Sequence, residues 1–296
     1  MKAQELLDEA PQSFLSEFWE YFSKNRGAVI GLVLIIFFVV VAILAPVLAP
    51  YDPTIVHAQS LRLPPFFSEG GTTEFLLGTD DVGRDILSRL IYGARISMGI
   101  GLAVVVLSAS IGTLLGLFAG YYGGRIEWFI MRIVDVLMAF PSILLAIVVV
   151  SVMGPGISNA IIAVAIVAIP SFTRIVRASV LAEKKKQYVM ASKTFGAGSF
   201  RIMTREILPN CMAPLIVQAT LGFSDGILNA AALGFLGLGA QAPMPEWGTM
   251  LSDARAFIQS NPWMVTLPGL CILVVVLGFN LFGDGLRDAL DPRLKR

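Results

Sequence analysis

Five long stretches of this chain carry almost no charge, and they constrain its fold more than any other feature. They are Gly27–Tyr51, Ile96–Gly124, Val136–Thr173, Ile207–Pro245, whose one charge is Asp225, and Ala256–Gly283. A helix needs about 20 mostly apolar residues to cross a bilayer core of about 30 Å. Val136–Thr173 is too long for one crossing and contains the turn-forming run Gly154-Pro155-Gly156, so we divide it near residue 155. The sequence therefore predicts an all-α membrane protein with six transmembrane helices.

The composition agrees with this interpretation. Charged residues make up 15% of the chain, whereas an average soluble domain has about 25%. The net charge of +1 gives no indication of nucleic acid as a partner, so the expected environment is the lipid bilayer.

The distribution of Lys and Arg predicts the orientation of the chain. With a cytoplasmic N-terminus, all but five of the 22 Lys and Arg residues lie inside, and the exceptions are Arg62, Arg84, Arg89, Arg95 and Arg255. Cytoplasmic loops carry the excess of positive charge, so both termini are expected in the cytoplasm. The expected order is a cytoplasmic interfacial helix (1–26), a first transmembrane helix (27–51), an external segment (52–95), a five-helix core (96–283) and a cytoplasmic tail (284–296). The core includes a cytoplasmic loop (181–209) and an external segment (240–262).

The two external segments have further expected features. Residues 80–92 are predicted to form an amphipathic helix with Thr79 or Asp80 as its cap. The sequence leaves open whether residues 238–262 form a plain loop or dip back into the membrane.

The residues that usually carry catalysis or bind metals are scarce. The chain has one histidine, His57, in a predicted loop, and two cysteines in or beside apolar runs. One histidine without other ligands at metal spacing is weak evidence for a site. We therefore predict no catalytic residue, no metal site and no cofactor in this chain.

Glycine recurs every fourth residue in the second predicted span, at Gly112, Gly116 and Gly120. This spacing puts small residues on one helix face, where another backbone can approach closely. We expect helix packing there, with a partner helix from this chain or from a second subunit.

Acidic residues inside the spans are rare and costly, so they usually face a cavity or a polar partner. Asp225 is predicted either to line a pore or to be satisfied locally, beside a helix break. Asp135 is expected to pair with Arg132 or Arg125.

The cytoplasmic loop has the pattern of two short helices. One is expected from about residue 186 to 195, followed by a break at 196–198 and a second helix with Ser199 as its cap. The apolar residues Val189, Phe195, Phe200 and Met203 are candidate anchors for a groove on a soluble partner. The alternative is a helix hairpin on the membrane surface with no partner.

This loop resembles the signature of the membrane subunits of bacterial ATP-binding-cassette importers. Gly196 matches the signature glycine, Ala191 its first alanine, and Leu208-Pro209 its closing pair. Met190 stands where the family has glutamate and Ser192 where it has a second alanine. Other matching stretches are Leu77–Asp85, Tyr92–Arg95, Ala232–Gly239, Pro245–Gly248 and Gly283–Pro292. Together they resemble the dipeptide, oligopeptide and nickel permease group, and most of all the C-type subunits of dipeptide permeases.

The resemblance implies a type I importer permease fold in the bacterial inner membrane and a transport subunit without enzymatic activity. Its implied partners are a homologous second permease subunit, two cytoplasmic ATPases that bind ATP and Mg, and an external peptide-binding protein. The implied ATPase-coupling residues are Tyr188, Met190, Ala191, Ser192, Phe195, Gly196, Phe200, Leu208 and Pro209. Gln218, Ser224, Asp225 and Asn229 are the candidate pore-lining residues, and Ser171 and Thr173 are further polar candidates.

The expected cargo is a dipeptide or a similar short peptide. Close relatives of this group carry oligopeptides, glutathione, nickel chelates or haem, so these cargoes are alternatives. A secondary transporter that acts without an ATPase is a further alternative, which inverted repeats or several buried acidic and histidine residues would favour.

Overall fold

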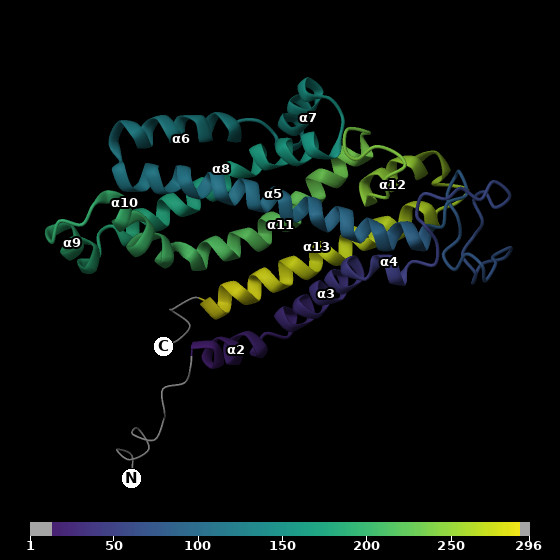
Figure 1. Cartoon of the computed structure of the whole chain (residues 1–296), viewed down its shortest axis with the longest axis horizontal. Coiled ribbons are helices and arrows are strands. Elements are labelled where there is room, and N and C mark those ends of the chain that lie inside the picture. The colour runs from purple at the N-terminus through teal and green to yellow at the C-terminus, as the bar shows by residue number, and fades with distance from the viewer. Residues whose placement is uncertain (1–13, 291–296) are drawn as a thin grey trace, which may run out of the picture.

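The computed structural model describes residues 14–290, and helices make up most of that part of the chain (Figure 1). The helices are α2 (Phe14–Lys24), α3 (Arg26–Ile43), α4 (Ala45–Leu48), α5 (Ile86–Tyr122), α6 (Gly124–Met138), α7 (Ser142–Met153), α8 (Ile157–Glu183), α9 (Gln187–Thr194), α10 (Ser199–Arg201), α11 (Met212–Phe235), α12 (Trp247–Ala254) and α13 (Trp263–Leu290). A π-helical segment (Ile202–Ile207) and a 3-10 turn (Leu208–Cys211) join α10 to α11. The predicted all-α fold is confirmed for the described residues.

Five helical runs of the described chain are long and apolar enough to cross a bilayer. They are α3, α5, α8, the continuous run Ser199–Phe235, and α13. The pair α6 and α7 passes the same test together but is bent by 95° at its break. The expected six spans are therefore present when the bent pair counts as one.

The boundaries of two expected spans need correction. The expected straight span over residues 136–155 is the bent pair of α6 and α7, and α6 already begins at Gly124. The sequence search missed this start because the first half of α6 contains charged residues, and the search looked only for uncharged runs. The expected separate helix over residues 80–92 is the start of α5, which runs unbroken from Ile86 to Tyr122. Asp85 caps it by accepting a hydrogen bond from the Ser88 N–H, so Thr79 and Asp80 are not its caps.

The segments expected on one side of the membrane lie at one end of the bundle (Figure 1). α2, α9 and the end of α13 lie at the left of that view, whereas α4, α12 and the segment between α4 and α5 lie at the right. α2 packs on the end of α13, where the Phe22 and Phe282 rings lie edge to face with centroids 5.7 Å apart. Parts of the predicted N-terminal helix (1–26) and C-terminal tail (284–296) fall outside the described residues. The cytoplasmic location of the termini stays a prediction.

α5 and α8 pack through the predicted glycine stripe. A Cβ atom built on Gly112 would lie 2.5 Å from the Cβ of Phe172, and equally tight positions recur at Gly116 and Gly120 against α8. Real Cβ atoms do not approach other atoms this closely, so the two backbones meet only because these residues are glycine. The partner helix belongs to this chain.

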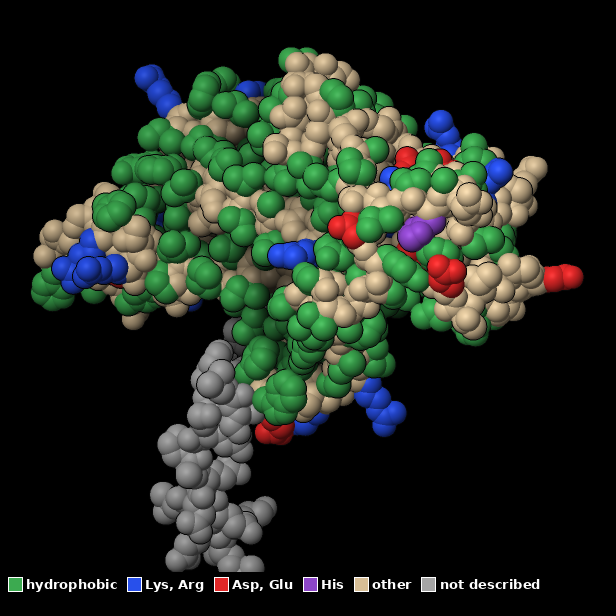
Figure 2. Space-filling view, turned by 45° about the vertical axis from the view of Figure 1, so that its right-hand side comes forward, with side chains coloured by type: hydrophobic (Ala, Val, Ile, Leu, Met, Phe, Trp, Pro, Cys, Tyr) green, Lys and Arg blue, Asp and Glu red, His purple; other side chains and the backbone are tan. Residues whose placement is uncertain are grey.

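The surface of the bundle is apolar over much of its area. Figure 2 shows hydrophobic side chains across much of the presented face, with Lys and Arg side chains clustered at its left extremity. Large apolar side chains such as Val33, Phe37, Leu102 and Val148 are more than half exposed. Such a surface suits hydrocarbon and not water.

Candidate functional site

The predicted coupling loop forms a compact projection at one end of the bundle (Figure 1). α9 ends at Thr194, and the chain turns at Gly196, whose φ is 82°. This left-handed conformation favours glycine because a Cβ would crowd the backbone. The second helix begins at Ser199, but the predicted Ser199 cap is wrong, since Gly198 holds the cap position and no side chain bonds to the helix end.

A polar network anchors α9 to the rest of the bundle. The Tyr188 hydroxyl donates a 2.5 Å hydrogen bond to Oε2 of Glu183, and Lys186 Nζ lies 2.6 Å from Oε1 of the same carboxylate. Asn210 Nδ2 donates to the Tyr188 hydroxyl over 3.2 Å. Burial, together with the Glu183 carboxylate, raises the pKa of Tyr188 to about 12, so its hydroxyl keeps its proton at neutral pH. The Tyr188 side chain thereby links the end of α8 to the 3-10 turn that precedes α11.

The apolar side chains of the loop divide into two groups. Phe195 is 91% exposed and Phe200 77% exposed, which leaves both rings free at the tip of the projection. Val189 and Met203 are buried, so the expectation that they serve as anchors for a partner is wrong. Val189 instead packs in a small core that includes residues of α5 and α8.

The remaining predicted coupling residues differ in their exposure. Met190, Ala191, Gly196 and Pro209 are exposed, whereas Ser192 and Leu208 are half-buried. Leu208 and Pro209 open the 3-10 turn that leads into α11. The exposed surface of the projection therefore lies around the Phe195 turn.

A cavity with a volume of about 250 Å³ lies between α7, α8 and α11. Gln218, Gly222, Asp225 and Asn229 line it from α11, at a spacing of four, three and four residues. That spacing keeps them on one face of the helix. The helix is otherwise largely apolar, so this polar stripe faces a cavity rather than lipid.

Two serines extend the polar lining of the cavity. Ser171 of α8 was a polar candidate from the sequence, and Ser142 at the start of α7 was missed. Ser142 follows Pro141 at the break between α6 and α7, and a serine beside a proline in an apolar run was the sequence signal that could have identified it. The cavity therefore has polar groups on three helices.

Two of the polar residues expected on the pore lie elsewhere. Ser224 faces α13, and its hydroxyl donates to the Val276 carbonyl over 3.3 Å. One residue along a helix turns the side chain by about 100°, so Ser224 and Asp225 cannot share a face. Thr173 is buried and donates to the Ile169 carbonyl over 2.9 Å.

The predicted surroundings of Asp225 and the predicted ion pair of Asp135 are both wrong. α11 is continuous from Met212 to Phe235, so there is no helix break at Asp225. Asp135 pairs with Arg174 of α8 at 2.6 Å, not with Arg132 or Arg125. The pairing partner lies on another helix, where sequence spacing gives no guidance.

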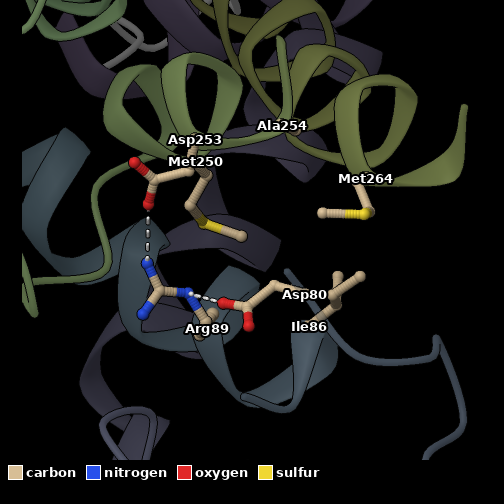
Figure 3. Close-up of a pocket in the computed structure, with 7 residues that line it drawn as sticks. All are labelled: Asp80, Ile86, Arg89, Met250, Asp253, Ala254 and Met264. Carbon is tan, nitrogen blue, oxygen red and sulfur yellow. Dashed lines mark ion pairs between the residues drawn. The ribbon is translucent and has the colours of Figure 1, made fainter. Parts of the chain in front are cut away.

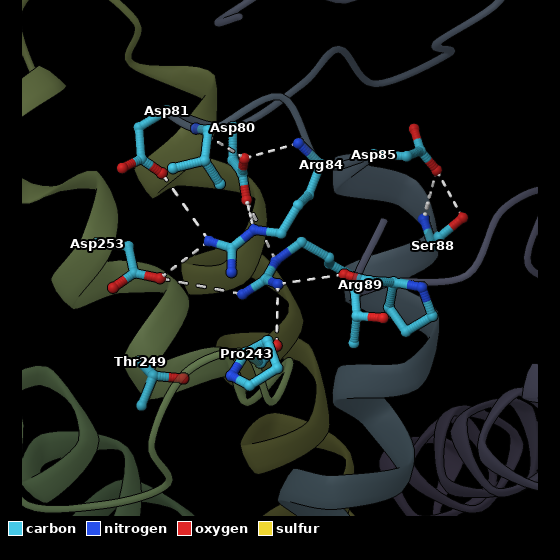
Figure 4. A network of polar contacts seen from close by, with 12 residues as sticks. Asp80, Asp81, Arg84, Asp85, Ser88, Arg89, Pro243, Thr249 and Asp253 are labelled. Carbon is cyan, nitrogen blue, oxygen red and sulfur yellow. Dashed lines mark hydrogen bonds and ion pairs between the residues drawn. The ribbon is translucent and has the colours of Figure 1, made fainter. Parts of the chain in front are cut away.

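The opposite end of the bundle contains a buried ionic cluster that sequence reasoning missed (Figures 3 and 4). Arg84 Nε lies 2.6 Å from Oδ2 of Asp80, and Arg89 Nε lies 3.4 Å from the same atom. Both guanidinium groups also reach Asp253 of α12, at 3.4 and 3.9 Å. Arg89 further donates to the carbonyls of Pro53 and Pro243, each over 3.3 Å. The loop at Pro53, the loop at Pro243 and α12 are thus held against the start of α5.

The cluster is packed and not a binding site. The adjoining cavity, lined by Arg89 and Met264 among others, has a volume of about 10 Å³ (Figure 3). A single water molecule needs about that much space or slightly more. The two arginines therefore stabilise the packing of these segments.

The external segment 238–262 contains the short helix α12. Trp247 is fully buried, and its Nε1 donates to the Leu90 carbonyl over 3.1 Å. Glu246 caps α12 by accepting hydrogen bonds from the Gly248 and Thr249 N–H groups, each over 2.8 Å. Within this segment α12 packs against α5, α11 and α13, and turns lie on both sides of it.

Two family models match the chain. Residues 112–296 match the binding-protein-dependent transport system inner membrane component, and residues 13–65 match the N-terminal TM domain of oligopeptide transport permease C.

Curated relatives match almost the whole length. The dipeptide transport system permease protein DppC of Haemophilus influenzae is 56% identical over 287 residues, which cover 97% of each chain. Its counterpart from Escherichia coli K12 is 57% identical and covers 97% of this chain and 95% of that one. The glutathione transport system permease protein GsiD of Pectobacterium atrosepticum is 44% identical and covers 97% of this chain and 94% of that one.

Solved structures show the same fold. A chain of the MetNI methionine ABC transporter, in an inward facing conformation, matches with a TM-score of 0.58 at 19% identity. The match covers 70% of this chain and 98% of that one. The predicted type I permease fold is thereby confirmed.

Proposed function

This chain belongs to the family of binding-protein-dependent transport system inner membrane components, and from that premise we propose that it forms half of the pore of an ATP-driven dipeptide importer. It is a multi-pass protein of the bacterial inner membrane and a transport subunit of an ABC importer. The observation that carries the cargo assignment is an identity of 56–57% to dipeptide permeases over nearly the whole chain. The glutathione permease is less similar, at 44%.

In this proposal the projection around Gly196 docks on a cytoplasmic ATPase. Its support is the pair of exposed rings, Phe195 and Phe200, beside exposed Lys193 and Arg201. Apolar anchors ringed by polar groups are typical of helices that fill a groove on a partner. Two such ATPases hydrolyse ATP, and this chain carries out no catalysis.

A second, homologous permease subunit completes the pore. The cavity beside Asp225 is partly open, and its polar groups come from α7, α8 and α11 of this chain. A peptide bond and two charged termini need polar contacts all round, because crossing bare hydrocarbon is prohibitive. The missing half of the lining comes from the second subunit.

The external end receives a peptide-binding protein. The ionic cluster around Arg89 supports this role because it fixes the loop after Pro53, the start of α5 and the loop at Pro243 as one rigid surface. A rigid surface allows docking without a large ordering cost.

Reconstitution of the complete transporter tests the proposal. We expect liposomes that contain both permease subunits and both ATPases to take up labelled Ala-Ala only with ATP and the loaded binding protein. Uptake without nucleotide hydrolysis would refute an ATP-driven importer.

The position of the projection needs a separate test. In a chain with Cys211 and Cys271 replaced by serine, Phe195→Cys should react with an impermeant maleimide from the cytoplasmic side alone. Reaction from the external side would refute the docking assignment, whatever the uptake result.

A further inference from the structure

Asp225 carries a carboxylate in the middle of a membrane-spanning helix without a cationic partner among the described residues. The carboxylates of Asp135 and Glu127, near the ends of the spans, pair with Arg174 and Arg177. Asn229 Nδ2 donates a 2.8 Å hydrogen bond to the backbone carbonyl of Asp225 and not to its carboxylate. The carboxylate oxygens are therefore free to bind something else.

The surroundings of Asp225 are polar but otherwise uncharged. The cavity lining adds the amides of Gln218 and Asn229 and the hydroxyls of Ser142 and Ser171. Amides and hydroxyls both donate and accept hydrogen bonds, which suits a peptide group. Asp225 is the one charged residue of the lining, so a positive group that enters the cavity has one place to bind.

The size of the cavity fits part of a small molecule. Its volume of about 250 Å³ is slightly below the range of roughly 300–1,000 Å³ that is typical of closed ligand pockets. Gly222 and Gly226 belong to its lining, and a Cβ on them would lie 3.1 Å from the Phe172 ring and 3.2 Å from Val104, so both glycines also pack closely on neighbouring helices. A cavity of this size holds one end of a dipeptide.

We propose that Asp225 binds the α-ammonium group of the peptide during its passage through the pore. This inference rests on the proposed function, because it names the part of the cargo that this cavity recognises. A free α-amino group has a pKa of about 7.7–8.0, so most peptides carry it as ammonium at neutral pH. The ammonium donates to the Asp225 carboxylate, and the amides of Gln218 and Asn229 bond the peptide group behind it.

A single carboxylate suits a site that has to release its cargo. A conduit needs contacts that favour entry but remain weak enough for exit. The side of Asp225 that is open in this chain admits water, which screens the charge pair. The site therefore orients the amino end of the peptide without retaining it.

The test uses the complete reconstituted transporter with Asp225→Asn, Asp225→Glu and the control Glu74→Gln, which removes an exposed carboxylate far from the cavity. The two readouts are the initial uptake rate of Ala-Ala and the ATPase activity that the loaded binding protein stimulates. Asp225→Asn should slow uptake about tenfold, as expected for loss of one charge-assisted hydrogen bond, with stimulated ATPase activity unchanged. Asp225→Glu should restore most of the uptake, and Glu74→Gln should behave like the unmodified protein.

A second measurement reports the charge of the site directly. The uptake ratio of Ala-Lys to Ala-Glu, each normalised to Ala-Ala, should fall in Asp225→Asn and stay constant in Glu74→Gln. Ala-Lys has a second ammonium group, so a carboxylate in the path favours it over Ala-Glu.

Two outcomes are decisive against the inference, and a third is decisive against the proposed function. Unchanged Ala-Ala uptake in Asp225→Asn overturns it. The second outcome combines an unchanged Lys-to-Glu ratio in Asp225→Asn with the loss either of stimulated ATPase activity or of the second permease subunit on purification. It shows that Asp225 pairs with a cation of that subunit. If the unmodified transporter imports no dipeptide, the proposed function fails instead.

Discussion

Tyr188 and Glu183 are joined by a 2.5 Å hydrogen bond that fixes the angle between α8 and α9. Glu183 is the last residue of a membrane-spanning helix, and Tyr188 lies in the first turn of the projecting helix. Any displacement of α9 therefore acts directly on α8.

The first prediction concerns this bond. Tyr188→Phe keeps the ring but removes the hydrogen-bond donor. We expect the free energy of unfolding to fall by about 1 kcal/mol, because hydrogen bonds to charged groups are worth roughly 1.5–3 kcal/mol and this bond is partly exposed to water. The number of dipeptides imported per ATP hydrolysed should fall. Tyr122→Phe, a change at an exposed tyrosine of α5, is the control. Equal coupling ratios for both variants would contradict the anchoring role.

The second prediction concerns the turn at Gly196. Gly196→Val places a β-branched residue at a φ of 82°, which costs about 1–2 kcal/mol or more and displaces the Phe195 tip. We expect normal insertion into the membrane, with uptake abolished. Gly198→Ala, at a φ of −65° with open space around it, should retain uptake. Uptake assays on membranes with matched protein levels would decide, and normal transport by Gly196→Val would exclude the turn from coupling.

The third prediction compares two glycines of the same helix. Gly112→Ala puts a methyl group 2.5 Å from the Phe172 Cβ, so α5 and α8 have to separate. Overpacking of this kind costs about 1–3 kcal/mol, which a lower melting temperature in detergent would report. Gly99→Ala meets no atom within 4 Å and should leave the melting temperature nearly unchanged. A similar melting temperature for the two variants would show that the close approach is unimportant.

The fourth prediction concerns the buried arginine of the external end. Arg89→Ala leaves Asp80 with one cation fewer and frees the carbonyls of Pro53 and Pro243. Breaking a buried ion pair from one side costs about 3–5 kcal/mol. We expect faster proteolysis of the segment between α4 and α5, whereas Arg62→Ala, an exposed neighbour, should not change the cleavage rate.

The fifth prediction is a pH dependence from Glu246. Burial raises the pKa of this carboxyl above its usual value, despite hydrogen bonds from Gly248 and Thr249. The folded chain therefore holds the proton more tightly than the unfolded chain does. Its contribution to stability is complete below the unfolded pKa of about 4.3 and is lost as the pH rises through the raised folded pKa.

Glu246→Gln should remove this part of the pH dependence, because glutamine does not titrate. The measurement is the melting temperature between pH 4 and pH 8, compared with Glu74→Gln, which should keep the original slope. Identical slopes for the two variants would rule out Glu246 as the titrating group.

The fold was predictable from the sequence because a bilayer imposes a simple rule on charge. Uncharged runs located the spans, and the turn at Gly196 followed from glycine between two helical patterns. The same rule failed at α6, which includes Glu127 and Asp135, because counting charges does not reveal that both carboxylates pair with arginines of α8.

The candidate site was only partly predictable. Gln218, Asp225 and Asn229 stand out as polar groups in an apolar helix, and the structure brings them together in one cavity. Ser224 has the same composition signal but points to α13, which helical periodicity could have indicated. The Arg89 cluster joins segments more than 150 positions apart, a relationship that no local pattern contains.

The unbroken helical run from Ser199 to Phe235 has a mechanical consequence. Phe200 and Asp225 lie on this run, with a π-helical segment and a 3-10 turn between them. In the proposed importer, a displacement of Phe200 would therefore reach Asp225 along one continuous stretch of backbone. The timing of nucleotide hydrolysis and the binding of the cargo would then depend on the same piece of backbone.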